Sequence, residues 1–235
     1  MQVTEPPVER WTVTRTHALA LVASCFTLVA LLGVGVLTTF APQMDLDGAV
    51  SEALYAGDHR SASLNTLLEV LTAPGVSLFR IAVFLPVVIL LLVRRAIWTA
   101  AWVAIPVLSI GPLNTLLKET FGRVRPDFDQ GGARLDSLSY PSGHSSGIAT
   151  LVTVGLLLLV PLVAHKVLRR TVVVLGVVLV LLVGLTRMWL GVHFLSDVVG
   201  GWALGVGWSV LVVTALGGLP GHRAALPAPE RTPAA

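Results

Sequence analysis

Charged residues are scarce in this chain, and their scarcity excludes an ordinary water-soluble domain. Only 12% of the 235 residues are Asp, Glu, Lys or Arg, whereas a soluble domain carries roughly 25%. Hydrophobic residues make up 54% of the chain, and the mean hydropathy is +0.83. The composition therefore predicts a membrane protein.

Cysteine is almost absent, and basic clusters of the kind that bind nucleic acid are missing. The one cysteine, Cys25, has no partner in the chain, which excludes an intramolecular disulfide and a cysteine-based zinc site. The formal net charge is +3, but no basic cluster stands beside aromatic residues that could stack on bases. The expected partner is a membrane lipid rather than a nucleic acid, and no sequence feature indicates an oligomeric state.

What the chain has in abundance is long apolar runs. A helix that crosses a bilayer needs about 20 apolar residues, and six runs approach or exceed that length. They lie at residues 18–40, 76–93, 97–117, 147–164, 171–190 and 198–216. They predict an all-α fold, a polytopic bundle of six transmembrane helices over residues 18–216.

The charges in alternate loops predict how this bundle sits in the plasma membrane. Arginine and lysine gather on one side, as at Arg94, Arg95 and Lys166, and most acidic residues lie on the other. Since basic loops stay in the cytoplasm, both termini are expected there. These are the segment 1–17 and a disordered, Pro- and Ala-rich tail at 217–235.

The longest loop, residues 41–75, has leucines at helical spacing between polar residues. This spacing predicts one or two short helices at the membrane interface. They are expected either to cover the outer ends of the bundle as a lid or to form a rim that guides a lipid inward.

The third run ends in a pair of cations. Lys118 closes the run, and Arg125 follows seven residues later, directly before Pro126. Proline keeps the residue before it out of helical geometry, so the guanidinium can turn back over the helix end. A planar guanidinium suits two phosphate oxygens and a lysine supplies a mobile charge. The alternative is a pair of interfacial cations that bind lipid headgroups.

The tetrapeptide Pro141, Ser142, Gly143, His144 comes directly before the fourth run. Glycine lets the backbone approach an anion, and amides at a helix N-terminus point outward. Ser142 can donate its hydroxyl to the same oxygens, and His144 stands where a leaving oxygen needs a proton. The alternative is a simple helix cap.

The last motif lies between the fifth and sixth runs. His193 and Asp197 are four residues apart, which on a helix places them on one face. The carboxylate can hold one ring nitrogen as a donor and leave the other free as a nucleophile or base. Arg187 can close the pocket from the opposite wall. The alternative is a buried histidine with a structural hydrogen bond.

Taken together, these motifs resemble those of the type 2 phosphatidic acid phosphatase superfamily, which includes lipid phosphate phosphatases and vanadium haloperoxidases. The pattern reads Lys118 to Arg125-Pro126, Pro141 to His144, and Thr186-Arg187 to His193 to Asp197. Thr186 replaces the serine of the family pattern and keeps its hydroxyl. The resemblance covers a catalytic core at about residues 76–216.

The resemblance implies a role for each matching residue. Lys118, Arg125 and Arg187 are expected to bind the phosphate oxygens, with help from Ser142 and the amide of Gly143. No metal ion and no cofactor are implied, because the three cations supply the positive charge. Three further residues, Pro126, Pro141 and Thr186, are expected to support the pocket.

The implied chemistry uses both histidines. His193 is expected to attack phosphorus, oriented by Asp197, and to form a phosphohistidine, while His144 protonates the leaving oxygen and then activates water. The implied function is a membrane lipid phosphatase acting at the outer interface. Its substrate is a polyprenyl diphosphate as first choice, with phosphatidic acid and phosphatidylglycerophosphate left open.

Two rival functions remain at this stage. Residues 143–147 also fit the G-x-S-x-G pattern of serine hydrolases, with Ser145 as the nucleophile. That pattern needs a strand before the serine, and the apolar runs are too long for strands. A non-catalytic lipid-binding or transport protein could also keep a phosphate pocket, but it would not need the two histidines.

Overall fold

A computed structural model describes residues 14–57, 59–128 and 137–219, and all regular structure in these ranges is helical. The elements are α1 (Arg15–Leu37), α2 (Ala41–Leu54), α3 (Ala62–Thr72), the 3-10 turn η1 (Ala73–Gly75), α4 (Ser77–Val93), α5 (Ile97–Phe121), α6 (Gly143–Leu159), the 3-10 turn η2 (Val160–Leu162), α7 (Lys166–Trp189) and α8 (Leu195–Ala215). The predicted all-α membrane fold is confirmed.

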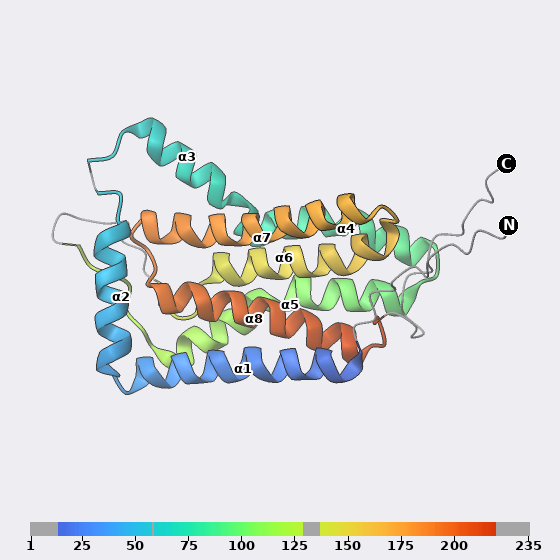
Figure 1. Cartoon of the computed structure of the whole chain (residues 1–235), viewed down its shortest axis with the longest axis horizontal. Coiled ribbons are helices and arrows are strands. Elements are labelled where there is room, and N and C mark those ends of the chain that lie inside the picture. The colour runs from blue at the N-terminus through green and yellow to red at the C-terminus, as the bar shows by residue number, and fades with distance from the viewer. Residues whose placement is uncertain (1–13, 58, 129–136, 220–235) are drawn as a thin grey trace, which may run out of the picture.

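Five of these helices, namely α1, α5, α6 with η2, α7 and α8, are long and apolar enough to cross a membrane. The remaining predicted span, residues 76–93, corresponds to α4, which has 17 residues and joins α3 through η1 at a bend of 44°. The bent pair gives the bundle up to six spans. Figure 1 shows the long helices running side by side.

The last three spans begin earlier than the apolar runs predicted. Helices α6, α7 and α8 start at Gly143, Lys166 and Leu195, three to five residues before the predicted starts. The apolar runs omit the first turn of each helix because that turn carries polar residues. Those turns include Gly143 and His144 of α6 and Asp197 of α8. Ser142 directly precedes α6, and His193 lies two residues before α8, so His193 and Asp197 do not share a helix as their spacing suggested.

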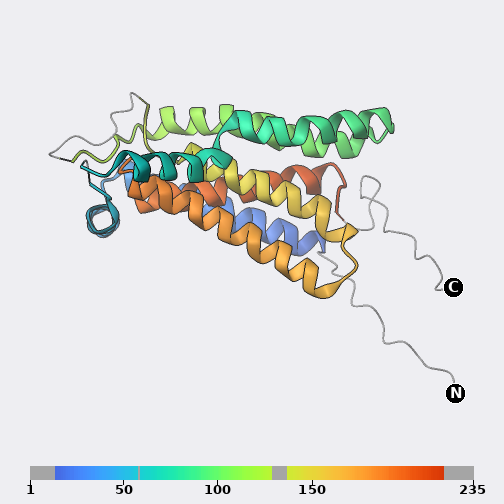
Figure 2. The same cartoon turned by 90° about the horizontal axis from the view of Figure 1, so that it is seen from above.

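Helix α8 lies at the centre of the bundle, between α1 and α6 (Figure 1). Small residues face its neighbours: a Cβ on Gly201 would lie 2.6 Å from the carbonyl oxygen of Ser142 and 2.8 Å from the Cβ of Ser145. Because lipid tails are as apolar as leucine, such close backbone approach is what drives helices together in a membrane. Figure 2 shows α4 and α5 paired along one side, with α6 between them and α7.

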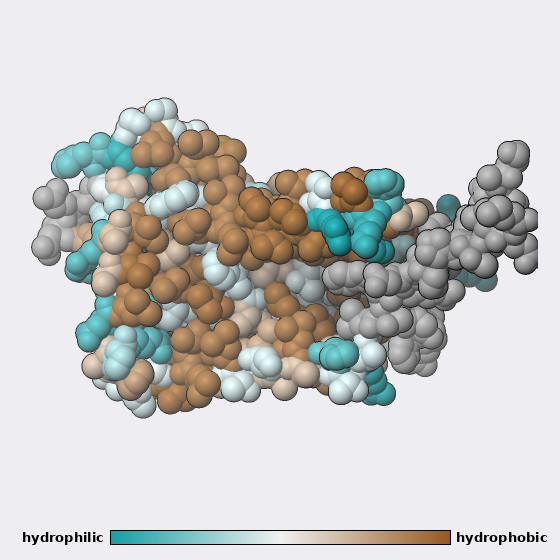
Figure 3. Space-filling view, viewed as in Figure 1, coloured by the Kyte–Doolittle hydropathy of each residue, from teal (hydrophilic) through white to brown (hydrophobic). Residues whose placement is uncertain are grey.

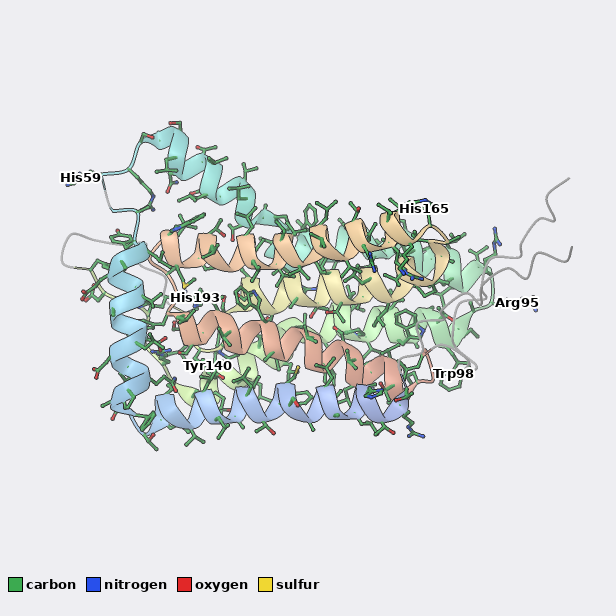
Figure 4. The ribbon with its side chains drawn as sticks, in the orientation of Figure 1. His59, Arg95, Trp98, Tyr140, His165 and His193 are labelled. Carbon is green, nitrogen blue, oxygen red and sulfur yellow. The ribbon has the colours of Figure 1, made fainter. Side chains whose placement is uncertain are left out.

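An apolar belt surrounds the bundle. Large hydrophobic side chains such as Leu78 and Val93 are 75% and 74% exposed, and Figure 3 shows this apolar surface between more polar ends. One end of the bundle carries Arg95, Trp98 and His165, whereas His193 lies near the other end (Figure 4). The belt is the surface expected to contact lipid.

The predicted short helices of the 41–75 loop are α2 and α3. Helix α2 runs across one end of the bundle (Figure 1), the end near which His193 lies (Figure 4). Its Asp47 and Ser51 are buried. Helix α3 leads into α4. Whether they act as a lid or as a lipid-guiding rim stays a prediction.

The structure describes the first three residues of the predicted tail, 217–219. Gly218 donates its N–H to the Val213 carbonyl, and Leu219 is buried in the core, so residues 217–219 form an ordered turn after α8. Residues 1–13 of the predicted N-terminal segment and 220–235 of the tail lie outside the described residues.

Candidate active site

The residues of all three motifs meet at the end of the bundle that α2 crosses. They come from the ends of α5 and α7, the starts of α6 and α8, and the segments between these helices. His144 interacts electrostatically with Arg187, His193, Arg125 and Lys118. Residues separated by up to 75 positions in the sequence are thus gathered around one histidine.

His193 is held between a carboxylate and a cation. Its Nδ1 lies 3.3 Å from Oδ2 of Asp197, and its Nε2 lies 3.1 Å from a terminal nitrogen of Arg125. A guanidinium can only donate hydrogen bonds, so Nε2 must accept with its lone pair and Nδ1 must carry the proton. This tautomer leaves Nε2 unprotonated, so it can act as a nucleophile once Arg125 turns away from it.

Burial keeps the imidazole neutral. His193 is 2% exposed, and this desolvation lowers its pKa from 6.5 to about 3, although the hydrogen bond and charge of Asp197 oppose the change. At neutral pH the Nε2 lone pair is therefore available without prior deprotonation.

Asp197 is fully buried and has several donors. Its Oδ2 accepts the hydroxyl proton of Ser139 and the backbone N–H of Phe194, the latter at 2.9 Å. Its Oδ1 accepts from Arg123 at 2.8 Å. The bond to Phe194 also caps the start of α8, where a negative charge is favourable. One carboxylate thus fixes both the helix end and the histidine.

The three predicted phosphate-binding cations have different surroundings. Arg125 donates to the Val192 and Ser137 carbonyls at 2.6 and 2.7 Å, and Lys118 donates to the Leu138 carbonyl. Among the described residues, the guanidinium of Arg187 donates one hydrogen bond, to the Thr72 hydroxyl at 3.4 Å, and its buried Nε has no partner.

An unpaired buried donor costs about 1–3 kcal/mol. A bound phosphate oxygen would satisfy the Nε of Arg187, and the neighbouring charges of Arg125 and Lys118 would stabilise the same anion. The site is therefore chemically suited to an oxyanion.

Ser142 serves as the N-cap of α6. Its Oγ accepts from the backbone N–H of Ser145 at 3.4 Å and from the Ser145 hydroxyl at 3.1 Å, and its own N–H donates to the Asp197 carbonyl at 2.9 Å. The helix-cap interpretation thus holds for Ser142. The hydroxyl retains its own proton for a further acceptor, so the cap does not preclude phosphate binding.

Two other predicted residues take local roles. The hydroxyl of Thr186 donates to the Val183 carbonyl of its own helix at 2.7 Å, so it steadies the end of α7 beside Arg187. Ser145, the nucleophile of the rival esterase reading, is buried in the first turn of α6. No strand precedes it within the described residues, so the serine-hydrolase elbow has no support.

A network of charges behind the site was not predicted from the sequence. Arg123 bridges two buried carboxylates, donating to Asp197 at 2.8 Å and to Asp47 of α2 at 2.7 Å. Asp47 also accepts from the backbone N–H of Ser196 at 2.8 Å. The sequence offered one sign of this network. Arg123 lies two residues before Arg125, and residues two apart in an extended segment share a side. No motif or spacing in the sequence pointed to Asp47 or Ser139 as members of the site.

Fold and site together define a multi-helix membrane protein in which three cations and two histidines meet at one end of the bundle. The comparisons with known proteins agree with the membrane fold. The sequence profile of the PAP2 superfamily matches residues 96–219, and the chain belongs to this superfamily. The resemblance drawn from the motifs is confirmed.

Two bacterial lipid phosphatases are similar to this chain in sequence. The chain is 34% identical to phosphatidylglycerophosphatase B of Bacillus subtilis (strain 168) over 168 residues, which cover 68% of this chain and 78% of that protein. A lipid A 1-phosphatase of Rhizobium johnstonii is 32% identical over 123 residues, 48% of this chain and 46% of that protein.

The fold also matches a solved structure. The crystal structure of a transmembrane PAP2-type phosphatidylglycerolphosphate phosphatase from Bacillus subtilis superposes with a TM-score of 0.67 at 30% identity. The match covers 81% of this chain and 93% of that one, so it extends well beyond the three motifs.

Proposed function

We propose that this protein is an integral-membrane lipid phosphatase that hydrolyses a phosphomonoester or diphosphate headgroup through a phosphohistidine on His193. The observation that carries the proposal is the unprotonated Nε2 of His193, held by Asp197 and facing the cation Arg125. A binding protein would need the cations but not an oriented, neutral imidazole.

The first step transfers the phosphoryl group. The Nε2 lone pair attacks phosphorus in line with the leaving oxygen, and the P–O bond to the lipid breaks. His144, which enters the step protonated because the phosphate dianion lies beside it, gives the leaving oxygen its proton. Arg125 turns from Nε2 to the phosphate, and Lys118 and Arg187 take up charge on the equatorial oxygens.

The second step returns the enzyme to its starting state. His144, now neutral, takes a proton from water as the water oxygen attacks the phosphohistidine. The P–N bond breaks, inorganic phosphate leaves, and Nε2 recovers its lone pair. The three cations hold the anion throughout, so the mechanism uses no metal ion and no cofactor.

The substrate is a phosphorylated lipid with its head at the membrane interface. The names of the relatives point to phosphatidylglycerophosphate and lipid A 1-phosphate, and polyprenyl diphosphate has the same phosphate chemistry. Cations gather at the end of the bundle opposite the site, which supports a site that faces the periplasmic or extracellular side.

Phosphate release by His193→Ala tests the proposal. The purified protein in detergent should release phosphate from at least one of these lipids, with and without EDTA, and the variant should lose at least about 1,000-fold in rate because the nucleophile is gone. The matched control is His165→Ala, an exposed histidine at the far end of the bundle.

Each outcome discriminates between functions. A variant that keeps half of the wild-type rate would refute the nucleophile assignment, and a wild-type protein with no phosphatase activity would favour a non-catalytic lipid-binding or transport role. Rapid quenching at alkaline pH, where a phosphohistidine survives, should trap ³²P from labelled substrate on the wild type and none on His193→Ala.

A further inference from the structure

A cavity of about 320 Å³ lies next to His144, between the start of α4, the middle of α5 and the start of α6. Its polar lining residues are Ser77, Arg80, Asn114, Thr115, His144 and Ser146. This volume falls within the usual range for small-ligand pockets, about 300–1,000 Å³. None of the phosphate-binding cations lines it.

Arg80 is the unusual member of this lining. It is 2% exposed, within an apolar helix, and its guanidinium donates from Nε to the Val107 carbonyl at 3.0 Å and from Nη2 to the Ser77 hydroxyl at 3.3 Å. No carboxylate of the described residues forms an ion pair with it. A buried cation without a counter-charge is costly in a membrane span and marks a functional position there.

Gly147 has no side chain, and this leaves room for the Arg80 guanidinium beside the active site. A Cβ on Gly147 would lie 2.7 Å from Nη1 of Arg80 and 2.3 Å from the Gly75 carbonyl oxygen. Gly147 follows His144 by three residues, so the two lie on one face of α6, about one turn apart. The guanidinium therefore sits about one helical turn from the catalytic histidine.

His144 lies between the phosphate-binding cations and the cavity. It interacts electrostatically with the phosphate-binding cations and His193, and it also lines the cavity with Arg80. In an in-line displacement the leaving oxygen points away from the nucleophile, toward the proton donor. The leaving group must therefore start next to His144 and extend away from His193. The cavity is the space next to His144 into which it can extend.

We propose that Arg80 binds an anionic phosphate carried by the leaving group, so that the enzyme selects lipids with a second phosphate beyond the scissile bond. This inference rests on the proposed function and adds a substrate class to it. A lipid diphosphate fits, because its leaving group is a lipid monophosphate. Phosphatidylglycerophosphate also fits, because its leaving group retains a phosphodiester. Phosphatidic acid does not, because it leaves neutral diacylglycerol.

Rates for two substrates with different leaving groups test the proposal. We would measure kcat/KM of wild type and Arg80→Gln with farnesyl diphosphate and with phosphatidic acid in mixed micelles. The variant should lose about 10- to 100-fold with the diphosphate, the value of a charge-assisted hydrogen bond, and less than threefold with phosphatidic acid. Arg94→Gln is the control, an exposed arginine at the other end of the same helix.

Several results would overturn the proposal. Equal losses with both substrates would make Arg80 a structural anchor for α5, and no loss with either would remove it from substrate binding. A wild type that cleaves only phosphatidic acid would also refute it while leaving the phosphatase function intact. A wild type with no activity on any of these lipids would instead refute the proposed function.

Folding of the variant needs its own measurement. Size-exclusion elution and the thermal midpoint in detergent should match those of the wild type. If Arg80→Gln does not fold, Arg80→Lys decides the question, because it keeps the buried charge but loses the planar fork. It should show a selective loss of about 3- to 10-fold with the diphosphate, and an unselective loss would count against the proposal.

Discussion

At the scale of single residues, the proposed nucleophile His193 is held through a chain of charges that reaches α2. Asp197 orients His193, Arg123 holds Asp197, and Asp47 holds Arg123. Arg123 also lies 4.1 Å above the centre of the Phe194 ring. Each member of this chain is buried, so none can turn toward water if its partner is removed.

Asp47→Asn should disturb catalysis from outside the phosphate pocket. The substitution keeps the shape of the side chain but removes the charge that pairs with Arg123, at a cost of about 1–3 kcal/mol. We expect the thermal midpoint to fall and kcat to drop about tenfold, while KM changes little because no substrate contact is lost.

Asp45→Asn is the matched control, since Asp45 is an exposed residue of the same helix. It should leave both kcat and the thermal midpoint unchanged. If Asp47→Asn lowered stability without lowering kcat, the network would be structural and would not position the nucleophile.

At the scale of elements, the site depends on how closely α6 and α8 approach each other. Ser142 N–H donates to the Asp197 carbonyl, which joins the first turns of the two helices. Gly201 lies one turn further along α8 and contacts the Ser142 carbonyl oxygen without a side chain between them. The distance between the helices thus sets the distance between the second and third motifs.

Gly201→Ala should therefore reduce activity although it adds only one methyl group. The new Cβ would lie 2.6 Å from a backbone oxygen, and such overpacking costs about 1–3 kcal/mol. We expect a lower thermal midpoint and at least a tenfold loss of kcat/KM for any lipid substrate.

Gly155→Ala provides the comparison on α6, because a Cβ there meets nothing within 4 Å. This variant should be as stable as the wild type, or slightly more stable because alanine favours helix. Equal effects of the two substitutions would show that the α6–α8 contact does not control the site.

At the scale of the whole molecule, the two ends of the bundle differ in charge. Arg15, Arg94, Arg95 and Lys166 lie at the end of the bundle opposite His193, at or beside the termini of α1, α4, α5 and α7. Asp45, Asp47 and Glu52 lie on α2, at the end with the site. This asymmetry is the basis of the proposed orientation.

Cysteine labelling in intact cells tests that orientation. In a Cys25→Ser background, His59→Cys should react with a membrane-impermeant maleimide, and Arg95→Cys should react only after the membrane is permeabilised. Both positions are exposed and lie at opposite ends of the molecule (Figure 4). The reverse pattern would place the site in the cytoplasm without affecting the phosphatase proposal.

The sequence by itself determined the helices and the chemical identity of the pocket. Apolar runs of bilayer length leave few alternatives to transmembrane helices, and three motifs with cations and two histidines indicate phosphate chemistry wherever they converge. The helix starts were less predictable, because polar first turns interrupt the apolar pattern on which the boundaries of α6, α7 and α8 were based.

Only the tertiary structure decided which residues support the pocket. Asp47 is 76 positions from Arg123, and Arg80 reaches the carbonyl of Val107 on a neighbouring helix. Such contacts depend on how the helices pack and rotate against one another, and no local periodicity records that packing. Arg80, inside an apolar run, and Arg123, two residues before a motif cation, therefore find their partners only when α2, α4, α5 and α8 are in place.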